Sequence, residues 1–362
     1  MRKLLYIGHN IENAKTGGEI GSKNLQVVLK SVFNENYTRY ELINQSRWQV
    51  FINKCFLIYP GLSLLDFKHI LVYIKKHQPD YVFIETAQYG ALVKCIKRHF
   101  PNICIITYFH NIEIQYAKSY LSLHNPKSWY FYVLTCWNER RAIKYSDLCT
   151  AINDADASIM LSAYNRNPDL IFPFSTKNLL TSDDVQKLIQ NKQRIYKHNC
   201  LFVGSNFFGN TDGLNWFIQN VLPKTDVHLT IVGNEMTKAF SNTEKITVHD
   251  FVEDLSVFYR ETDFVLLPII SGGGMKTKTA DALMWGKAII GTPEVFFGYE
   301  VSELHGIYEC KTEDDFICAI KNIYEDEIYD FNEAIHQRFM KWHSLEAVTS
   351  SVKDFFFRRE EN

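Results

Sequence analysis

Short apolar runs alternate with segments of helical periodicity along most of the chain. Each apolar run has the length of one β-strand, and glycine or proline often stands at its end. The expected strands cover residues 4–8, 81–85, 103–109, 148–152, 201–205, 228–233, 246–249, 264–270 and 288–291. The expected helices cover residues 22–33, 89–99, 129–143, 157–164, 255–262 and 276–285. A further helix through Trp216, Phe217 and Val221 is expected after a loop that contains Gly209, Asn210 and Gly213. Strands that alternate with helices predict an α/β protein with doubly wound, Rossmann-like parallel sheets.

The chain has 362 residues, more than one hydrophobic core usually supports, so we expect two domains. The alternation stops before a polar stretch at about 175–199 and restarts after it. We therefore expect an N-terminal domain over 1–174 and a C-terminal domain over 175–344 that begins with this interdomain connection. The tail, about 345–362, contains Phe355–Phe357 followed by two arginines. It is expected to form a helix that packs back on the N-terminal domain. The alternative is that it contacts a membrane surface.

The charge balance excludes some classes of partner. Lysine and arginine (39) nearly equal aspartate and glutamate (41), which gives a formal charge of −2. A nucleic-acid-binding protein normally shows a basic excess, so no nucleic acid is expected. The eight cysteines show no C-x-x-C spacing and lie mostly in apolar runs, as reduced thiols of a cytoplasmic protein do. The apolar run at the N-terminus is shorter than that of a signal peptide, and no run is long enough to span a membrane.

Residues 263–292 carry the strongest functional signal in the chain. They read as strand, glycine-rich loop, helix and strand, which places a helix N-terminus beside the C-terminal edge of a parallel sheet. The loop holds three consecutive glycines, Gly272, Gly273 and Gly274. Lys276 and Lys278 stand in the first helical turn, where a structural helix prefers acidic residues, and Asp281 shares the face of Lys278. This pattern predicts a site for phosphate, whereas glycines for packing beside solvated lysines are the alternative.

Four further features have both a functional and a structural interpretation. Gly17 and Gly18 lie in a loop before the first helix. This loop either binds substrate or needs the glycines only to form a tight turn. His110 follows an expected strand at the sheet edge where such folds bind ligands, although a lone histidine is often structural. The D-x-D run within Asn153–Asp156 could bridge a metal, but helix capping is the favoured interpretation. The aromatic segment 129–143 is expected to be a core helix, with membrane contact as the alternative.

Three segments together resemble a known family. They are 201–223, 251–255 and GGGMKTKTADALMWGKAIIGTP from Gly272, and they are similar to the C-terminal half of GT-B-fold glycosyltransferases, the large retaining group called family four. HNIE at 110–113 and Gly17-Gly18 match the N-terminal half. The resemblance implies two Rossmann-like domains facing a cleft and transfer of a sugar from a nucleotide diphosphate donor, with retention and without a metal or another cofactor.

The same resemblance assigns roles to individual residues. Lys276, Lys278 and the amides of Gly272–Gly274 would hold the donor diphosphate, with Lys276 stabilising the leaving group. The remaining expected contacts are Asp281 with the ribose, Phe251 and Val252 with the base, His110 with the donor sugar as a catalytic residue, and Gly17 and Gly18 with phosphate and acceptor. Two positions depart from the family pattern. Gly273 replaces the first glutamate of the E-x7-E motif, and Ser205 and Asn206 stand where Arg and Lys are common.

The sequence therefore favours a glycosyltransferase of surface polysaccharide assembly, acting on a glycan or lipid-linked acceptor in the cytoplasm or at the inner face of the membrane. A nucleotide-sugar epimerase of the same fold and a non-catalytic protein that binds sugar nucleotides remain alternatives.

Overall fold

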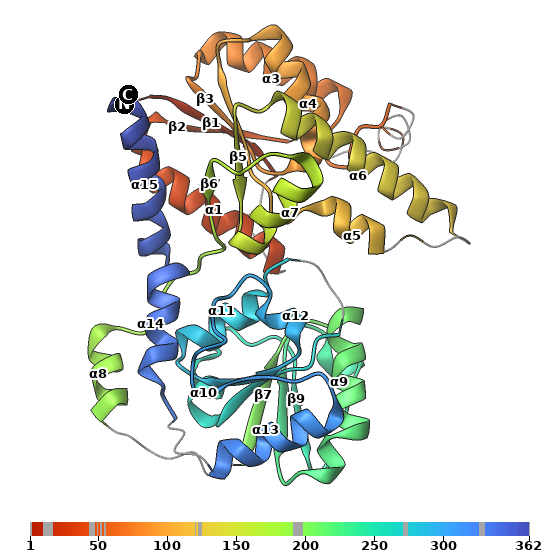
Figure 1. Ribbon diagram of the computed structural model, residues 1–362, viewed down its shortest axis with the longest axis vertical. Coiled ribbons are helices and arrows are strands. Elements are labelled where there is room, and N and C mark those ends of the chain that lie inside the picture. The colour runs from red at the N-terminus through yellow and green to blue at the C-terminus, as the bar shows by residue number, and fades with distance from the viewer. Residues whose placement is uncertain are drawn as a thin grey trace. The chain divides into compact units, whose positions relative to one another are not determined.

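The computed structural model describes residues 2–9, 17–42, 48, 50, 53, 56–119, 121, 125–190, 198–270, 274–325 and 330–361. The chain divides into two compact units (Figure 1). The N-terminal unit comprises Met1–Pro173 with Val348–Asn362, and the C-terminal unit comprises Phe174–Ala347.

The N-terminal unit contains a six-stranded sheet in the order β2-β1-β3-β4-β5-β6. All its strand pairs are parallel. Its strands are β1 (Leu4–Gly8), β2 (Tyr37–Glu41), β3 (Tyr81–Ile84), β4 (Cys104–Thr107), β5 (Leu148–Ala151) and β6 (Leu170–Ile171). Its α-helices are α1 (Gly17–Phe33), α3 (Leu64–His77), α4 (Gly90–His99), α5 (Glu113–Ser119), α6 (Pro126–Tyr145) and α7 (Asp154–Tyr164), with short 3-10 helices η1 (Asn34–Asn36) and η2 (Ala87–Tyr89). The strand order reverses between β1 and β3, and doubly wound sheets bind ligands at such a point.

The C-terminal unit has a second parallel sheet, in the order β12-β11-β10-β7-β8-β9. Its strands are β7 (Asn199–Val203), β8 (His228–Val232), β9 (Ile246–His249), β10 (Phe264–Leu267), β11 (Ala288–Gly291) and β12 (Ile307–Glu309). Its α-helices are α8 (Ser182–Gln190), α9 (Phe208–Asn220), α10 (Ser256–Glu261), α11 (Thr277–Met284), α12 (Pro293–Phe296), α13 (Glu313–Glu325) and α14 (Glu333–Trp342), with η3 (Leu222–Lys224) and η4 (Met236–Lys238). This is the Rossmann strand order, and its reversal lies between β7 and β10.

The central strands are buried on both faces, which explains their uninterrupted apolar runs. The last helix, α15 (Leu345–Glu361), begins in the C-terminal unit and continues in the N-terminal one. There its Phe356 packs edge-on against Phe33 and Tyr81, with ring centroids 5.0 and 5.3 Å away.

The structure corrects several predicted boundaries. The loop expected over Gly209–Gly213 is wrong, because α9 begins at Phe208 and contains these residues. Helix α1 begins at Gly17 instead of residue 22. The hydrophobic pattern did not predict β2, β6, β12, α3, α13 or α14. Strand β2 shows the reason, since its residues are half-buried or exposed and give no apolar run.

Of the eight cysteines, the seven that the structure describes are free thiols. No helix within the described ranges is long and apolar enough to cross a membrane.

Candidate functional site

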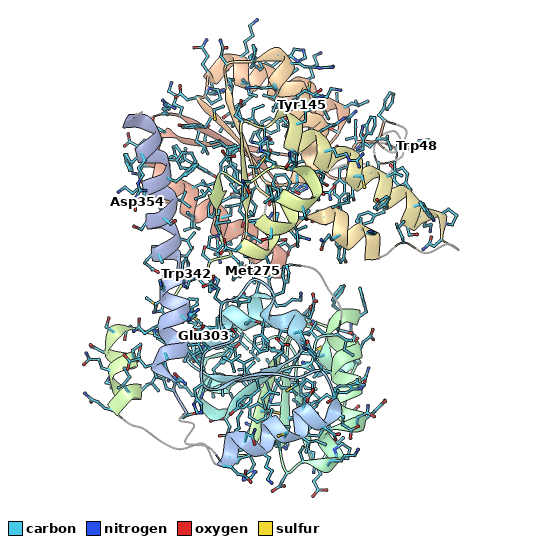
Figure 2. All side chains as sticks on the ribbon, in the orientation of Figure 1. Trp48, Tyr145, Met275, Glu303, Trp342 and Asp354 are labelled. Atoms are coloured by element: carbon cyan, nitrogen blue, oxygen red, sulfur yellow. The ribbon has the colours of Figure 1, made fainter. Side chains whose placement is uncertain are left out.

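The strand reversal of the C-terminal unit places the ends of β7 and β10 side by side. The loop after β10 leads into α11, and Met275 (labelled in Figure 2) lies just before that helix. Gly274 of this loop has a φ of 69°, a left-handed conformation that favours glycine. Gly272 and Gly273 lie outside the described residues. We call the residues around this junction, Gly204, Asn210, Gly274, Lys276, Lys278, Asp281 and Glu294, the α11 mouth.

Lys276 occupies the N-cap position of α11 and is held from two sides. Its Nζ donates to the carbonyl oxygen of Gly274 at 2.8 Å and lies 3.0 Å from Glu294 Oε1. Its own carbonyl oxygen accepts a hydrogen bond from the Tyr299 hydroxyl at 2.8 Å. A fixed ammonium therefore stands at the positive end of the helix dipole, where the side-chain charge and the dipole both favour an anion.

Lys278 reaches back to the end of β7. Its Nζ donates to Asn210 Oδ1 at 2.6 Å and lies 4.8 Å from the centroid of the Phe202 ring. A Cβ built on Gly204 would come within 3.1 Å of the same Nζ. Lys278 of α11 therefore lies beside the end of β7, where the resemblance leads one to expect Arg and Lys.

The Lys278 ammonium is destabilised at this position. Burial and then repulsion from Lys276 lower its pKa to about 7, although Asp281 acts in the opposite direction. Lys287, a buried lysine of the same unit, instead pairs with Asp330 at 2.5 Å. Lys278 has no such carboxylate partner within the described residues. A bound anion would restore its charge, as expected at a phosphate site.

Asp281 belongs to the mouth, whereas the predicted base-binding residues lie farther along the sheet. Burial raises the pKa of Asp281 to about 7, and Lys278 acts to lower it. Phe251 and Val252 follow β9, which is the edge strand of the sheet and the third strand away from β10. Phe251 is 72% exposed.

Gly17 and Gly18 form the N-terminal turn of α1 in the other unit. A Cβ added to Gly18 would meet nothing within 4 Å, so packing does not require a glycine there. The first turn of a helix has free amide groups, and α1 follows β1 at the strand reversal of its sheet. The arrangement suits phosphate, as at the α11 mouth.

His110 lies after β4, and its ring is held by Glu85, the residue that follows β3. Its ring is hydrogen-bonded to the backbone of Glu85, and its centroid lies 4.7 Å from that of Tyr108. Burial lowers the pKa of His110, with Glu85 acting in the opposite direction, which favours the neutral imidazole. The Glu85 carboxylate accepts from the amide of His9 at 2.9 Å. Glu85 was not predicted as a site residue, although it ends an expected strand.

Two buried carboxyl groups, those of Glu139 and Asp156, fix the chain after His110. Glu139 Oε1 and Oε2 accept from the amides of Glu113 (2.8 Å) and Ile114 (3.1 Å), and Glu139 also accepts from the Tyr164 hydroxyl. Asp156 accepts from the amide of Ile112 at 3.3 Å. Burial raises the pKa of Glu113 and Glu139 to about 7, and that of Asp156 to about 6.

The capping interpretation of Asn153–Asp156 is confirmed. Asn153 is the N-cap of α7, and its side chain accepts from the Asp156 amide at 2.7 Å. Among the residues that the structure describes, no cluster of three or more His, Cys, Asp or Glu side chains could hold a metal.

A Glu139→Gln variant tests the contribution of these carboxyl groups. Glutamine offers one acceptor oxygen where three donors converge, so we expect a loss of about 1–3 kcal/mol in the free energy of unfolding. The folded pKa of Glu139 lies above its ordinary value of 4.5, so its contribution is full at low pH and falls as the pH rises through 7. The melting temperature at pH 5.5 and 8 checks both points. At pH 5.5 we expect a lower melting temperature in the variant, with a smaller difference at pH 8 and hence a smaller pH slope; an unchanged melting temperature at pH 5.5 would contradict this account.

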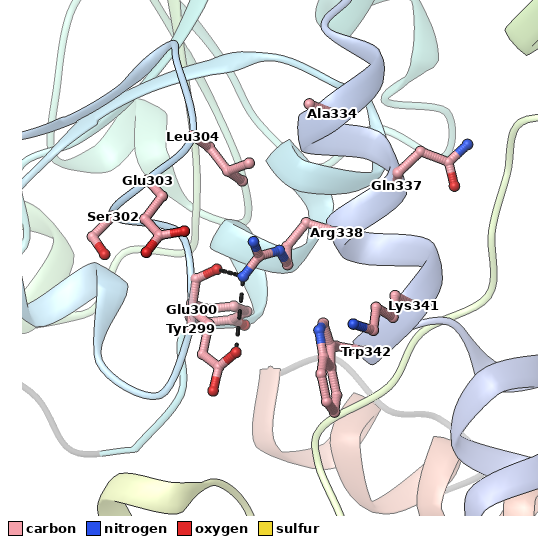
Figure 3. A pocket seen from close by; sticks show the side chains of 10 residues that line it. All are labelled: Tyr299, Glu300, Ser302, Glu303, Leu304, Ala334, Gln337, Arg338, Lys341 and Trp342. Carbon is pink, nitrogen blue, oxygen red and sulfur yellow. Dashed lines mark hydrogen bonds and ion pairs between the residues drawn. The ribbon is translucent and has the colours of Figure 1, made fainter.

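A separate pocket of about 750 Å³ lies in the C-terminal unit (Figure 3). It is lined by Tyr299, Glu300, Ser302, Glu303, Leu304, Ala334, Gln337, Arg338, Lys341 and Trp342. Arg338 donates to the carbonyl oxygen of Glu300 and lies 3.8 Å from its carboxylate. The pocket shares only Tyr299 with the surroundings of Lys276, so it is distinct from the α11 mouth.

The residues of the α11 mouth lie within a part of the chain that matches a family model. A model of the family described as glycosyl transferases group 1 matches residues 197–326. This part of the chain, which contains the α11 mouth, is thus similar to glycosyl transferases group 1, in agreement with the glycosyltransferase resemblance seen in the sequence. We call residues 197–326 the group 1 region.

One curated relative is 27% identical in an alignment of 228 positions that covers 56% of this chain and 55% of the relative. It is named as an uncharacterized 44.6 kDa protein in the cps region of Klebsiella pneumoniae. The chain thus spans about half the length of this relative.

Solved structures match the whole chain at low identity. Sucrose-phosphate synthase of Thermosynechococcus elongatus matches with a TM-score of 0.72, 11% identity and 100% of both chains covered. The lipopolysaccharide outer core galactosyltransferase WaaB matches at 0.68 and 12%, with 99% of both chains covered. HepE of Anabaena, solved with UDP and glucose, matches at 0.68 and 11%, with 98% and 99% covered. These similarities confirm the GT-B-like, two-domain α/β fold class.

Proposed function

We propose that this protein is a retaining glycosyltransferase that moves a sugar from a nucleotide diphosphate donor to a glycan or lipid-linked acceptor. The observation that carries the proposal is the Lys278 ammonium, half-buried at the strand reversal of the group 1 region with an amide oxygen as its polar partner. The donor diphosphate is the anion that compensates the charge of Lys278, and Lys276, which is paired with Glu294, adds a second ammonium beside it.

Similar proteins support the substrate class. HepE of Anabaena was solved with UDP-glucose as well as with UDP, and WaaB is named a galactosyltransferase of the lipopolysaccharide outer core. We infer the same donor class for this chain, and surface polysaccharide assembly as its setting. A lipid-linked acceptor would place the reaction at the cytoplasmic face of the membrane.

Each site residue has a definite role in this proposal. Lys276 and Lys278 hold the diphosphate and stabilise the negative charge that develops as it leaves. Two ammonium groups supply this charge from the protein itself, so we propose that transfer requires no metal. Asp281 accepts from the ribose, and Phe251 and Val252 lie along the base.

The N-terminal unit contributes the remaining contacts. The neutral imidazole of His110 contacts the donor sugar near the reacting carbon, and its orientation is fixed by Glu85. The helix N-terminus at Gly17 and Gly18 contacts phosphate and acceptor.

A panel of nucleotide diphosphate sugars, incubated with the purified protein and oligosaccharide or polyprenyl-linked acceptors, tests the proposal. We expect transfer from one donor class, with the anomeric configuration retained in the product by NMR, in buffer with a metal chelator. Conversion of the donor to an epimer without acceptor would identify an epimerase instead. Donor binding with neither transfer nor hydrolysis across the panel would favour a non-catalytic binding protein.

A further inference from the structure

Helix α6 exposes large apolar side chains that the core does not use. Trp129, Val133 and Trp137 are 46%, 46% and 48% exposed, and they follow one another at intervals of four residues. The opposite face of the helix packs on α4 and α5 through buried residues that include Leu134, Asn138 and Ala142. The exposed tryptophans therefore form a stripe on a helix whose position is already fixed by its other side.

Basic residues continue this stripe toward the end of the helix. Arg140, Arg141 and Lys144 lie with the tryptophans within an arc of roughly 120° at 3.6 residues per turn. The guanidinium of Arg141 lies 4.6 Å from the centroid of the Trp137 ring. On the adjacent α4, Lys94 lies 5.7 Å from the centroid of Tyr145, and so does Lys144.

The charge of this surface is of one sign. Helix α6 has one carboxylate, Glu139, which is buried and accepts hydrogen bonds from α5. Arg98 of α4 lies close enough to Arg141 to disfavour its charge. Within the described part of the chain, none of these basic residues pairs with a carboxylate. The whole chain has a formal charge of −2, so its composition does not predict this local positive surface.

We propose that the α6 patch, comprising Lys94, Arg98, Trp129, Val133, Trp137, Arg140, Arg141 and Lys144, binds the surface of a membrane that contains anionic phospholipids. Indole rings favour the boundary between lipid headgroups and acyl chains, and lysine and arginine attract the anionic headgroups. The same helix face supplies both, and the group of five cations matches the size of basic clusters that bind such lipids.

Charge complementarity favours lipid over a second copy of this chain. Two copies meeting through the patch would bring like charges together, which costs binding energy unless acids intervene. A bilayer surface instead gathers many mobile anionic headgroups around the cations while the tryptophans enter the interface.

Vesicle co-sedimentation with the full chain tests the proposal without donor or acceptor, so its result is independent of the transferase assignment. We expect binding to vesicles of phosphatidylcholine with about a third phosphatidylglycerol in about 0.05 M NaCl, and little binding to phosphatidylcholine alone. Raising NaCl to about 0.5 M should weaken binding, because salt screens exposed charges. Replacing Lys94, Arg141 and Lys144 together with glutamine should lower the affinity about 100-fold.

The aromatic part of the patch has its own variant and a matched control. Trp129→Ser with Trp137→Ser should lower vesicle affinity at least about tenfold and abolish most of the tryptophan quenching by brominated lipids. Trp342→Ser should leave both unchanged, because Trp342 is similarly exposed (43%) and has Lys341 4.9 Å from its ring, but lies on α14.

The circular dichroism melting curve of each variant shows whether it is folded. Equal vesicle binding by the folded double variant and the wild type would overturn the proposal. So would a dimer of the wild type without vesicles that this variant abolishes, since that result identifies a second copy as the occupant.

Discussion

Replacing Lys278 with alanine is expected to lower sugar transfer about 10²–10³-fold, mostly in kcat, as loss of one preorganised charge contact does. The side chain contacts Asn210 and the Phe202 ring, and neither can replace a cation beside a diphosphate. Steady-state kinetics with the donor identified from the panel measure the effect.

The pH profile distinguishes a charge contact from a packing role. The pKa of Lys278 is about 7 without an anion, so its charge is present below pH 7 and is lost as the pH rises. Affinity for a nucleoside diphosphate should therefore fall by up to about tenfold per unit above pH 7. Lys278→Arg keeps its charge throughout this range, so it should retain binding at pH 8.5 and flatten the profile. Isothermal titration from pH 6 to 9 measures both proteins.

Two other lysines calibrate this result. Lys276→Ala should also lower transfer by about 10²-fold, and the double variant should lose less than the product of the two effects, because both act on one diphosphate. Lys321→Ala is the control, since this lysine is exposed on α13 and its ion pair among the described residues is with Glu325, at 3.5 Å. Transfer by Lys278→Ala at the wild-type rate would remove the phosphate role from the α11 mouth.

The strands and the helix that carry Lys276 and Lys278 could be predicted from the sequence. The expected strand, helix and second strand correspond to β10 (Phe264–Leu267), α11 (Thr277–Met284) and β11 (Ala288–Gly291). Their signals lie within the segment itself, namely apolar runs, loop glycines and lysines at a helix start. The role of these residues toward a donor remains a prediction.

The partners of these residues could not be predicted. Asn210 lies 68 positions before Lys278, and Glu294 lies 18 positions after Lys276. Both contacts depend on which strands become neighbours, and no local periodicity encodes that. The carboxyl groups behind His110 were missed for the same reason, because Glu139 lies 26 positions after Glu113.

Helix α6 shows how a correct element can leave its function open. The segment 129–143 was expected to be a core helix, and one face of α6 is indeed in the core. The stripe of Trp129, Val133 and Trp137 has helical spacing too, so the sequence contains two apolar faces and does not indicate which one is buried. Only the packing of α4 and α5 decides this.

Gly213→Ala is expected to lower the free energy of unfolding by about 3 kcal/mol or more. Gly213 lies within α9, and a Cβ built there would overlap the carbonyl oxygen of Pro268, a backbone atom just after β10. Helix α9 would have to move away from the strand end, and Asn210, one turn earlier, would move with it. The melting temperature should therefore fall by roughly 10 °C, and any folded fraction should bind nucleoside diphosphate more weakly.

Gly18→Ala provides the matched control, because Gly18 is also helical but a Cβ there would meet nothing within 4 Å. Alanine lowers the conformational entropy of the unfolded chain, so this variant should melt at the wild-type temperature or slightly above it. The contrast separates close packing from helix propensity, since propensity alone would make both replacements stabilising. If Gly213→Ala melts like Gly18→Ala, α9 does not press against the end of β10. The position of Asn210 beside Lys278 would then lose its structural basis.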